Sequence, residues 1–297
     1  MTFLVIGKNG QFGRTLTSLL SSRGIEYEAF GSKELDIRSS SKTFELVKAL
    51  GPKVIINAAG WTDVDNAEYC AKEAFAVNAE GPQNLALASK NVGAIFIHIS
   101  SDYVFSGEST IPWSEDSMRI PATVYGKTKA SGEDSVMLNY SEKSYIFRTS
   151  WLYGQFGKNF ALTMTRAAIE GRQDSSERNR VNVVNDQFGQ PTHSLDLANQ
   201  IVNSVLNKIP FGIYHATNSG QASWYEFAYE IFGQVGADVS RVIPVSTLDF
   251  PRPANRPKFS VLGHESWRQT SIEPMRDWRI ALHEAMPAII SAVNTKE

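Results

Sequence analysis

The sequence predicts an α/β fold in which a doubly wound parallel sheet is followed by a smaller C-terminal region. Two observations predict this fold class. The apolar run Phe3–Ile6 is followed at once by a glycine-rich turn and then by apolar residues at helical spacing. Apolar runs and amphipathic segments then alternate as far as about residue 148. Such alternation is typical of parallel sheets with helical crossovers, which carry helices on both faces.

The glycine-rich turn Gly7-Lys8-Asn9-Gly10-Gln11-Phe12-Gly13 lies between the first predicted strand and the first predicted helix. Backbone N–H groups at the N-terminus of a helix attract anions, and glycines let a pyrophosphate approach them closely. A glycine triplet alone is weak evidence, but this position favours a dinucleotide site in a sheet of the Rossmann type. The predicted cofactor-binding residues in the turn are Gly7, Gly10, Gln11, Phe12 and Gly13.

The remaining elements follow from apolar periodicity and from glycine and proline stops. The predicted strands are 26–30, 54–56, 94–99, 181–184 and 212–216. The predicted helices are 12–24, 41–50, 67–77, 82–90, one that opens at 125, 159–171, 196–208, 223–235 and 276–285. Phe44, Val47 and Leu50 are expected to face inward. The polar segment 174–180 is the best candidate for a mobile loop.

Two strand ends carry residues suited to a dinucleotide. Ala58, Ala59 and Gly60 follow the strand 54–56, and small residues let a cofactor lie close, although a tight turn explains them about as well. Ser32 and Lys33 follow the strand 26–30, where an enzyme restricted to NAD commonly carries a carboxylate. A hydroxyl beside an ammonium would attract a 2′-phosphate, so we expect NADPH to be preferred and NADH tolerated.

Glu34 weakens the expectation of NADPH. A shift of register by two residues would place its carboxylate where the ribose 2′-hydroxyl is recognised, and that carboxylate would repel a 2′-phosphate.

A tyrosine and a lysine lie four positions apart at the start of the helix that opens at 125. At that spacing Tyr125 and Lys129 share one face, and an ammonium can stabilise a phenolate. The strand 94–99 delivers Ser100 and Ser101 at the sheet edge where such folds bind ligands. A serine hydroxyl, a phenol and an ammonium can together polarise a carbonyl and protonate it while a nicotinamide supplies hydride. We therefore predict Tyr125, Lys129 and one of these two serines to be catalytic.

Composition excludes several classes of protein. The chain has 297 residues, a formal net charge of −2 and 42% hydrophobic residues, so nothing indicates a nucleic-acid-binding surface. One cysteine, Cys70, excludes an internal disulfide and favours a cytoplasmic protein. The four-residue apolar run before Gly7 is too short for a signal peptide, and no window is apolar enough for a membrane span. The five histidines lack zinc-ligand spacing, so no metal site is expected.

The glycine turn, Ser101 and the Tyr125-x-x-x-Lys129 pair resemble the extended short-chain dehydrogenase/reductase superfamily. Four further strings, over nearly the whole chain, are similar to the dTDP-4-dehydrorhamnose reductases within it: residues 100–105, 148–154, 185–192 and 252–257. These enzymes usually have threonine where this chain has Ser101, a change that keeps the hydroxyl.

The resemblance implies reduction of the 4-keto group of dTDP-4-dehydro-β-L-rhamnose, the last step of dTDP-rhamnose biosynthesis. Tyr125 would donate the proton, Lys129 would lower the pKa of Tyr125 and hold the nicotinamide ribose, and Ser101 would bind the keto oxygen. Asp36 and Ile37 would lie against the adenine. The implied substrate-binding residues are Asp102, Tyr103, Trp151, Gln187, Arg252 and Arg256. The alternative for Trp151 is a core tryptophan, and the alternative for Arg252 and Arg256 is that they only solvate a proline-rich loop. For the two arginines we favour a clamp on the substrate pyrophosphate.

Residues 1–149, rejoined by about 193–216, are expected to bind the dinucleotide, and residues 150–192 and 217–297 the substrate. Some members of the family form a dimer through magnesium held by glutamates, but this chain has Arg14, Thr15 and Leu195 at those places. We expect any homodimer to lack a metal bridge. Two alternatives stay open: a reductase of another nucleotide-linked 4-ketosugar, and a dinucleotide-binding regulatory subunit.

Overall fold

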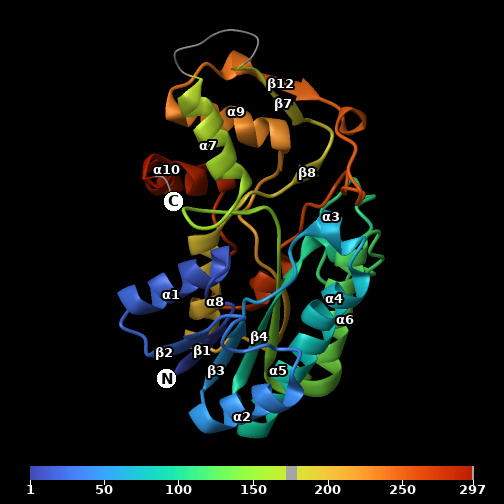
Figure 1. Cartoon of the computed structure of the whole chain (residues 1–297), viewed down its shortest axis with the longest axis vertical. Coiled ribbons are helices and arrows are strands. Elements are labelled where there is room, and N and C mark those ends of the chain that lie inside the picture. The colour runs from blue at the N-terminus through green and yellow to red at the C-terminus, as the bar shows by residue number, and fades with distance from the viewer. Residues whose placement is uncertain (172–178, 296–297) are drawn as a thin grey trace.

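The protein contains a six-stranded parallel sheet, which confirms the predicted fold class (Figure 1). The structure is a computed structural model and describes residues 1–171 and 179–295. The strand order is β10-β5-β4-β3-β1-β2. The strands are β1 (Phe3–Ile6), β2 (Tyr27–Phe30), β3 (Val54–Asn57), β4 (Ile95–Ser101), β5 (Ser144–Thr149) and β10 (Gly212–His215).

Helices cover both faces of this sheet, as Figure 1 shows. Helices α1 (Gln11–Ser22) and α8 (Ser194–Leu206) lie on one face, and α2 (Ser40–Leu50), α5 (Gly81–Val92) and α6 (Val124–Tyr140) on the other. Successive residues of a strand point to opposite faces. In β1, Phe3 and Val5 accordingly join the core beneath α1 and α8, whereas Leu4 and Ile6 join the core beneath α2, α5 and α6.

A second region, at the top of Figure 1, has a hydrophobic core of its own. It contains α7 (Phe160–Glu170), α9 (Trp224–Val235) and α10 (Trp278–Asn294), with β7 (Val181–Val184) and β12 (Val242–Val245) paired in parallel. Two short pairs connect it to the rest of the chain. These are β6 (Leu152–Tyr153) with β9 (Thr192–His193), and β8 (Phe188–Gly189) with β11 (Ala222–Ser223).

Several predicted elements differ from the structure. Strand β5 was not predicted, because its apolar stretch is only Tyr145–Phe147 and polar residues flank it. The predicted helix 67–77 is instead α3 (Val64–Ala67), α4 (Ala71–Phe75) and the start of a π-helical turn at Ala76–Glu80, whereas the predicted helix 82–90 is confirmed by α5. The prediction that Leu50 faces inward is wrong: it is 38% exposed, because it ends α2 just before the left-handed Gly51.

Two further points concern the chain's extent. Of the predicted mobile loop 174–180, residues 174–178 lie outside the described residues. Helix α10 runs well beyond the predicted 276–285 and continues through Pro287. Within the described part of the chain, no helix combines the length and apolar character that crossing a membrane requires.

Candidate active site

A cavity of about 630 Å³ opens where β1, β3, β4 and β5 end. We call it the central cavity. Ser101, Tyr125 and Lys129 line it together, although they come from β4 and α6. Residues of the glycine turn and of the segment after β3 line the same space: Gly10, Gln11, Phe12, Ala58, Ala59 and Gly60. The structure thus brings the predicted catalytic residues and most of the predicted cofactor-binding residues to one place.

The glycine turn requires its glycines. Gly7 has φ +95°, and a Cβ there would lie 2.6 Å from the backbone nitrogen of Ala59. Gly13 does not line a cavity, but a Cβ on it would collide with the carbonyl of Gly7. The turn can therefore fold tightly under the start of α1. No side chain caps that helix at Gly10, so its first N–H groups remain available to an anion.

A second cavity of about 400 Å³ adjoins the glycine turn on its other side. It is bordered by the end of β2, and we call it the β2 cavity. The two cavities share five residues at the turn and after β3, which are Asn9, Gly10, Ala58, Ala59 and Gly60. An elongated ligand with a pyrophosphate at its middle fits this arrangement, since the shared residues carry the exposed helix N-terminus.

The β2 cavity is lined by three of the four predicted adenosine-side residues. Ser32, Asp36 and Ile37 line it, together with Gly7, whereas the exposed Lys33 does not. Glu34 is engaged elsewhere: its carboxylate accepts hydrogen bonds from the Lys8 ammonium at 2.6 Å and the Gly31 backbone nitrogen at 2.7 Å. The carboxylate that weakened the expectation of NADPH is thus paired with Lys8, and Glu34 does not line this cavity.

Sequence reasoning missed a cation in the β2 cavity. Arg38 lines it and forms an ion pair of 2.7 Å with Asp36, which holds the pKa of that carboxyl below its ordinary value. A Ser-x-x-x-Asp-x-Arg spacing is the only signal in the sequence, and it is weak.

Ser101 and Tyr125 form the centre of the site. The Ser101 hydroxyl donates to Asp102 Oδ1 at 2.9 Å and accepts from the Tyr103 backbone nitrogen at 3.2 Å. Burial raises the pKa of Tyr125 to about 12, a hydrogen bond with Ser101 opposes that rise, and the nearby charge of Asp102 adds to it. The phenol therefore keeps its proton at neutral pH, as a proton donor must.

Lys129 lies buried four residues further along α6. Its Nζ donates to the carbonyl of Ile99 at 2.5 Å. Burial lowers the pKa of Lys129 to about 8, and the carboxylate of Glu133 opposes that shift. We expected Lys129 to lower the pKa of Tyr125, but in this arrangement the opposing influence on Tyr125 comes from Ser101. Lys129 remains the cation on the catalytic face of the helix.

Local contacts fix the start of α6. The Thr123 side chain caps the helix by accepting from the Gly126 backbone nitrogen at 3.0 Å, and the Glu68 carboxylate accepts from the Val124 nitrogen at 2.9 Å. A Cβ at Gly126 would collide with the carbonyl of Tyr103. Glycine at that position therefore lets α6 approach the end of β4 closely, which places Tyr125 beside Ser101.

Trp151 lines the central cavity and is only half-buried. Its backbone has φ +44°, which is uncommon for a residue with a side chain. Its indole stacks on Trp224 with centroids 3.5 Å apart and an angle of 10° between the planes. Gly189 leaves room for the ring, since a Cβ there would lie 2.5 Å from it. Trp151 is thus held as a wall of the cavity.

A third cavity, of about 260 Å³, lies in the second region. We call it the aromatic cavity. Tyr103 lines both this cavity and the central one, and Gln187, Arg252 and Arg256, which the resemblance implies for substrate binding, also line it. No motif in the sequence indicates its other principal lining residues, which are Phe160, Met164, Asn182, Trp224 and Phe250.

Asp65 in α3 holds the two arginines at the rim of the aromatic cavity. Its Oδ2 lies 2.8 Å from Arg256 Nη2 and 3.8 Å from Arg252 Nη1. Its Oδ1 also accepts from the Ala254 backbone nitrogen at 3.2 Å. The loop that carries the two arginines is therefore anchored to α3.

The described residues contain no group of three or more His, Cys, Asp or Glu that could hold a metal ion. At the places where a metal-bridged dimer would need glutamates, Arg14 lies over the ring of Phe156 at 4.4 Å. The hydroxyls of Thr15 and Ser194 lie 3.0 Å apart, and Leu195 is 39% exposed.

Comparison with known proteins finds a family model and several relatives that match nearly the whole chain. The family model described as RmlD substrate binding domain matches residues 1–290. The dTDP-4-dehydrorhamnose reductase of Streptomyces griseus is 43% identical over 97% of this chain and 93% of its own length. The dTDP-4-keto-6-deoxy-D-glucose reductase of Streptomyces niveus is 37% identical, over 97% of each chain. A dTDP-4-dehydrorhamnose reductase from Bacillus anthracis, solved in complex with NADP, is 36% identical with a TM-score of 0.90, covering 96% of this chain and 98% of that one.

Proposed function

Because the chain belongs to the RmlD substrate binding domain family, we propose that it is an NADPH-dependent dTDP-4-dehydrorhamnose reductase. It reduces the 4-keto group of dTDP-4-dehydro-β-L-rhamnose to give dTDP-L-rhamnose, the last step of dTDP-rhamnose biosynthesis. The observation that carries this proposal is the meeting of Ser101, Tyr125 and Lys129 in one cavity with the glycine turn.

The roles of the catalytic residues follow from their chemistry. NADPH supplies the hydride when it is bound, and the glycine turn, Ser32 and Arg38 would hold it. Ser101 binds the keto oxygen, and the Tyr125 phenol, whose pKa burial raises to about 12, donates the proton to that oxygen. The hydrogen bond with Ser101 would stabilise the phenolate left behind, and the Lys129 ammonium, on the same face of α6, would hold the nicotinamide ribose.

The substrate would extend from the central cavity into the aromatic cavity. Tyr103 lines both, so it marks the passage between the sugar and the nucleotide. Arg252 and Arg256 offer charge-assisted hydrogen bonds to a diphosphate, and the aromatic rings offer flat apolar faces to a base. Trp151 provides such a face for the deoxysugar, while Asp102 and Gln187 offer polar atoms.

Two parts of the chain divide these tasks. Residues 1–149 and 193–216 would bind the cofactor, a division supported by the pairing of β10 with β5 and the packing of α8 on the face that α1 covers. Residues 150–192 and 217–297 would bind the substrate, since they supply most of the aromatic cavity. We place the enzyme in the cytoplasm, where nucleotide sugars and NADPH would be available to it.

The test of this function is NADPH oxidation with enzymatically made dTDP-4-dehydrorhamnose, followed by the absorbance of the reduced nicotinamide. The Streptomyces niveus relative favours a second candidate, reduction of a different dTDP-linked 4-ketosugar, and dTDP-4-keto-6-deoxy-D-glucose is the comparison substrate. A higher kcat/KM with that substrate would move the assignment to it. Tight NADPH binding without oxidation with either sugar would favour a regulatory subunit instead.

The preference for NADPH over NADH should depend on the cations near the end of β2. We expect the wild type to have the higher kcat/KM with NADPH and to tolerate NADH. Arg38→Ala should lower the NADPH to NADH ratio of kcat/KM more than Lys33→Ala, because Arg38 lines the β2 cavity and Lys33 does not. Steady-state rates with both cofactors measure the ratio. An unchanged ratio in both variants would show that this segment does not read the phosphate.

A chelator should not change the oligomeric state. If the protein forms a homodimer, we propose that it does so without a metal bridge, because Arg14, Thr15 and Leu195 replace the required carboxylates. Gel filtration with and without the chelator should give the same elution volume. A dimer that dissociates when the chelator is added would contradict this.

A further inference from the structure

Three functional side chains of α6 follow one another at a spacing of four residues: Tyr125, Lys129 and Glu133. Residues at that spacing lie on one face of a helix. Glu133 lines none of the three cavities described above, and its side chain has no solvent exposure. A buried carboxylate is costly unless it is fully paired, so its presence beneath two catalytic residues calls for an explanation.

The carboxylate of Glu133 is held from three sides. It accepts from Arg148 Nε at 2.9 Å and Nη2 at 2.8 Å, a two-bond contact with β5. It also accepts from the hydroxyl of Ser100 at 2.5 Å, the residue just before Ser101 on β4. Arg119 Nη1 donates to it at 3.2 Å from the loop that precedes α6. One carboxylate therefore ties the catalytic helix to the two strands beside it.

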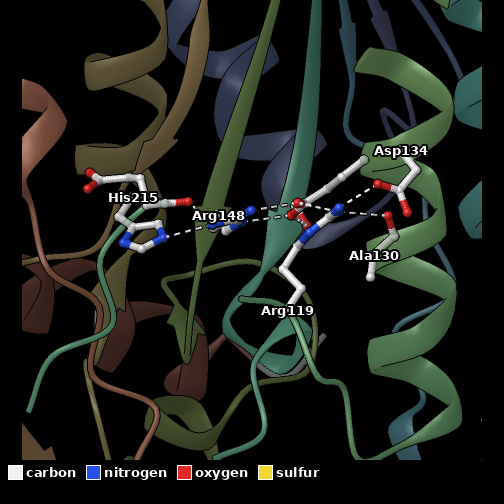
Figure 2. Close-up of polar contacts among 8 residues, drawn as sticks. Arg119, Ala130, Asp134, Arg148 and His215 are labelled. Carbon is white, nitrogen blue, oxygen red and sulfur yellow. Dashed lines mark hydrogen bonds and ion pairs between the residues drawn. The ribbon is translucent and has the colours of Figure 1, made fainter. Parts of the chain in front are cut away.

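Arg148 makes further polar contacts on its other side, including one with His215 (Figure 2). Its Nη1 donates to the carbonyl of Glu115 at 2.9 Å and lies 3.2 Å from His215 Nε2. Burial and the guanidinium keep the pKa of His215 well below its ordinary value, so the ring is neutral. In the neutral ring only one nitrogen carries a proton, and His215 Nδ1 donates that proton to the carbonyl of Gly263 at 2.9 Å. Nε2 therefore accepts the hydrogen bond from Arg148 Nη1.

We propose that Glu133 is a positioning residue for the reduction: its carboxylate, fixed by Ser100 and Arg148, keeps the ammonium of Lys129 charged in its buried place beside Tyr125. This inference rests on the proposed function in one respect: the reduction requires the charged form of Lys129. The geometry supports it directly, because a fixed negative charge one helical turn away favours the charged form of an amine.

The charges around Lys129 determine the sign of the effect. Burial lowers the pKa of Lys129 to about 8 and Glu133 opposes that shift. His98 on β4 also lies near, but burial and Lys129 keep its pKa well below the ordinary value, so it stays neutral. The cations around Glu133 are Arg148 from β5 and Arg119, and the outward-facing Asp134 pairs with Arg119. Neutralising Glu133 removes an anion and leaves Arg148 without its carboxylate partner, and both changes lower the pKa of Lys129.

The experiment measures the titration of Lys129 itself. Trace labelling with acetic anhydride between about pH 6 and pH 10, with the Lys129 peptide quantified by mass spectrometry, gives the midpoint without using the sugar substrate. Glu133→Gln should move that midpoint down by roughly one pH unit. The alkaline limb of the kcat profile should move with it. A purely structural role would lower kcat by the same factor at every pH and leave the midpoint where it was, which would overturn the proposal.

Two further variants make the result decisive. Asp134→Asn is the matched control: it neutralises the adjacent carboxylate, which also binds Arg119 but is 64% exposed, and the Lys129 midpoint should not move. A shift as large as that of Glu133→Gln would overturn the proposal. Arg119→Gln removes a cation from Glu133, so the midpoint should rise by roughly half a pH unit. This variant decides the matter if Glu133→Gln does not fold, since an unchanged or lower midpoint would contradict the proposal.

The labelling separates this inference from the function. Should the wild type fail to oxidise NADPH with either sugar, the proposed function fails, while the shifts of the Lys129 midpoint still support or overturn the role of Glu133.

Discussion

Replacing Tyr125 with phenylalanine should lower turnover by roughly 10²-fold or more, because it removes the proton donor of the reduction. The ring itself should keep its place. It packs edge-on against Tyr103 with centroids 5.4 Å apart, and phenylalanine preserves that contact. The affinity for NADPH, measured by the quenching of protein fluorescence, should therefore change little while kcat falls.

Tyr103→Phe is the matched control for that experiment. It removes a neighbouring phenol that lines the same cavity, but the mechanism assigns no proton transfer to it. Its kcat should fall far less than that of Tyr125→Phe, with KM for the sugar carrying most of the effect. Near-normal turnover in Tyr125→Phe would mean that the proton comes from another group, and the catalytic assignment would then be wrong.

Replacing Arg148 with methionine should lower the free energy of unfolding by about 3 to 5 kcal/mol, the range for removing one partner of a buried ion pair. Arg148 is 1% exposed, and its loss leaves the carboxylate of Glu133 without its two-bond partner. The carbonyl of Glu115 and His215 Nε2 would also lose their donor. Urea unfolding followed by circular dichroism measures the change.

Arg38→Met supplies the comparison for Arg148→Met. Arg38 also pairs with a carboxylate, that of Asp36, but their side chains are 49% and 42% exposed. Exposed pairs contribute about 0 to 1 kcal/mol, so this variant should unfold almost as the wild type does. Similar losses of unfolding free energy in the two variants would show that burial does not determine the cost of breaking an ion pair.

The sequence could predict the parts of the site that lie within local motifs. The glycine turn, Ser101 and the Tyr125–Lys129 pair each occupy a few consecutive residues at a strand end or at the start of a helix. Alternating strands and helices then place those ends at one edge of a parallel sheet. The residues that meet in the central cavity were therefore predictable without knowledge of the packing.

The remaining parts of the site depend on contacts between distant segments. Trp224 follows a well-formed capping box at Ser223, which predicts a helix start but not that its indole stacks on Trp151. Arg38 enters the β2 cavity because the segment after β2 folds back, and no periodicity describes such a segment. The pairing of Glu133 with Arg148 joins a helix to a strand 15 residues later. No local pattern predicts the contact of Trp224 with Trp151 or that of Glu133 with Arg148, and only the weak Ser-x-x-x-Asp-x-Arg spacing points to Arg38.

The place of β10 in the sheet has a consequence for synthesis on the ribosome. The edge of β5, whose six residues are all buried, is covered only when residues 212–215 pair with it. A nascent chain that has delivered the first five strands of the sheet therefore still exposes an apolar strand with unpaired backbone groups. A fragment that stops near residue 149 would keep this edge open permanently. We expect such a truncated gene product to aggregate. We expect only a chain that extends past His215 to pair β10 with β5 and so cover this edge of the sheet.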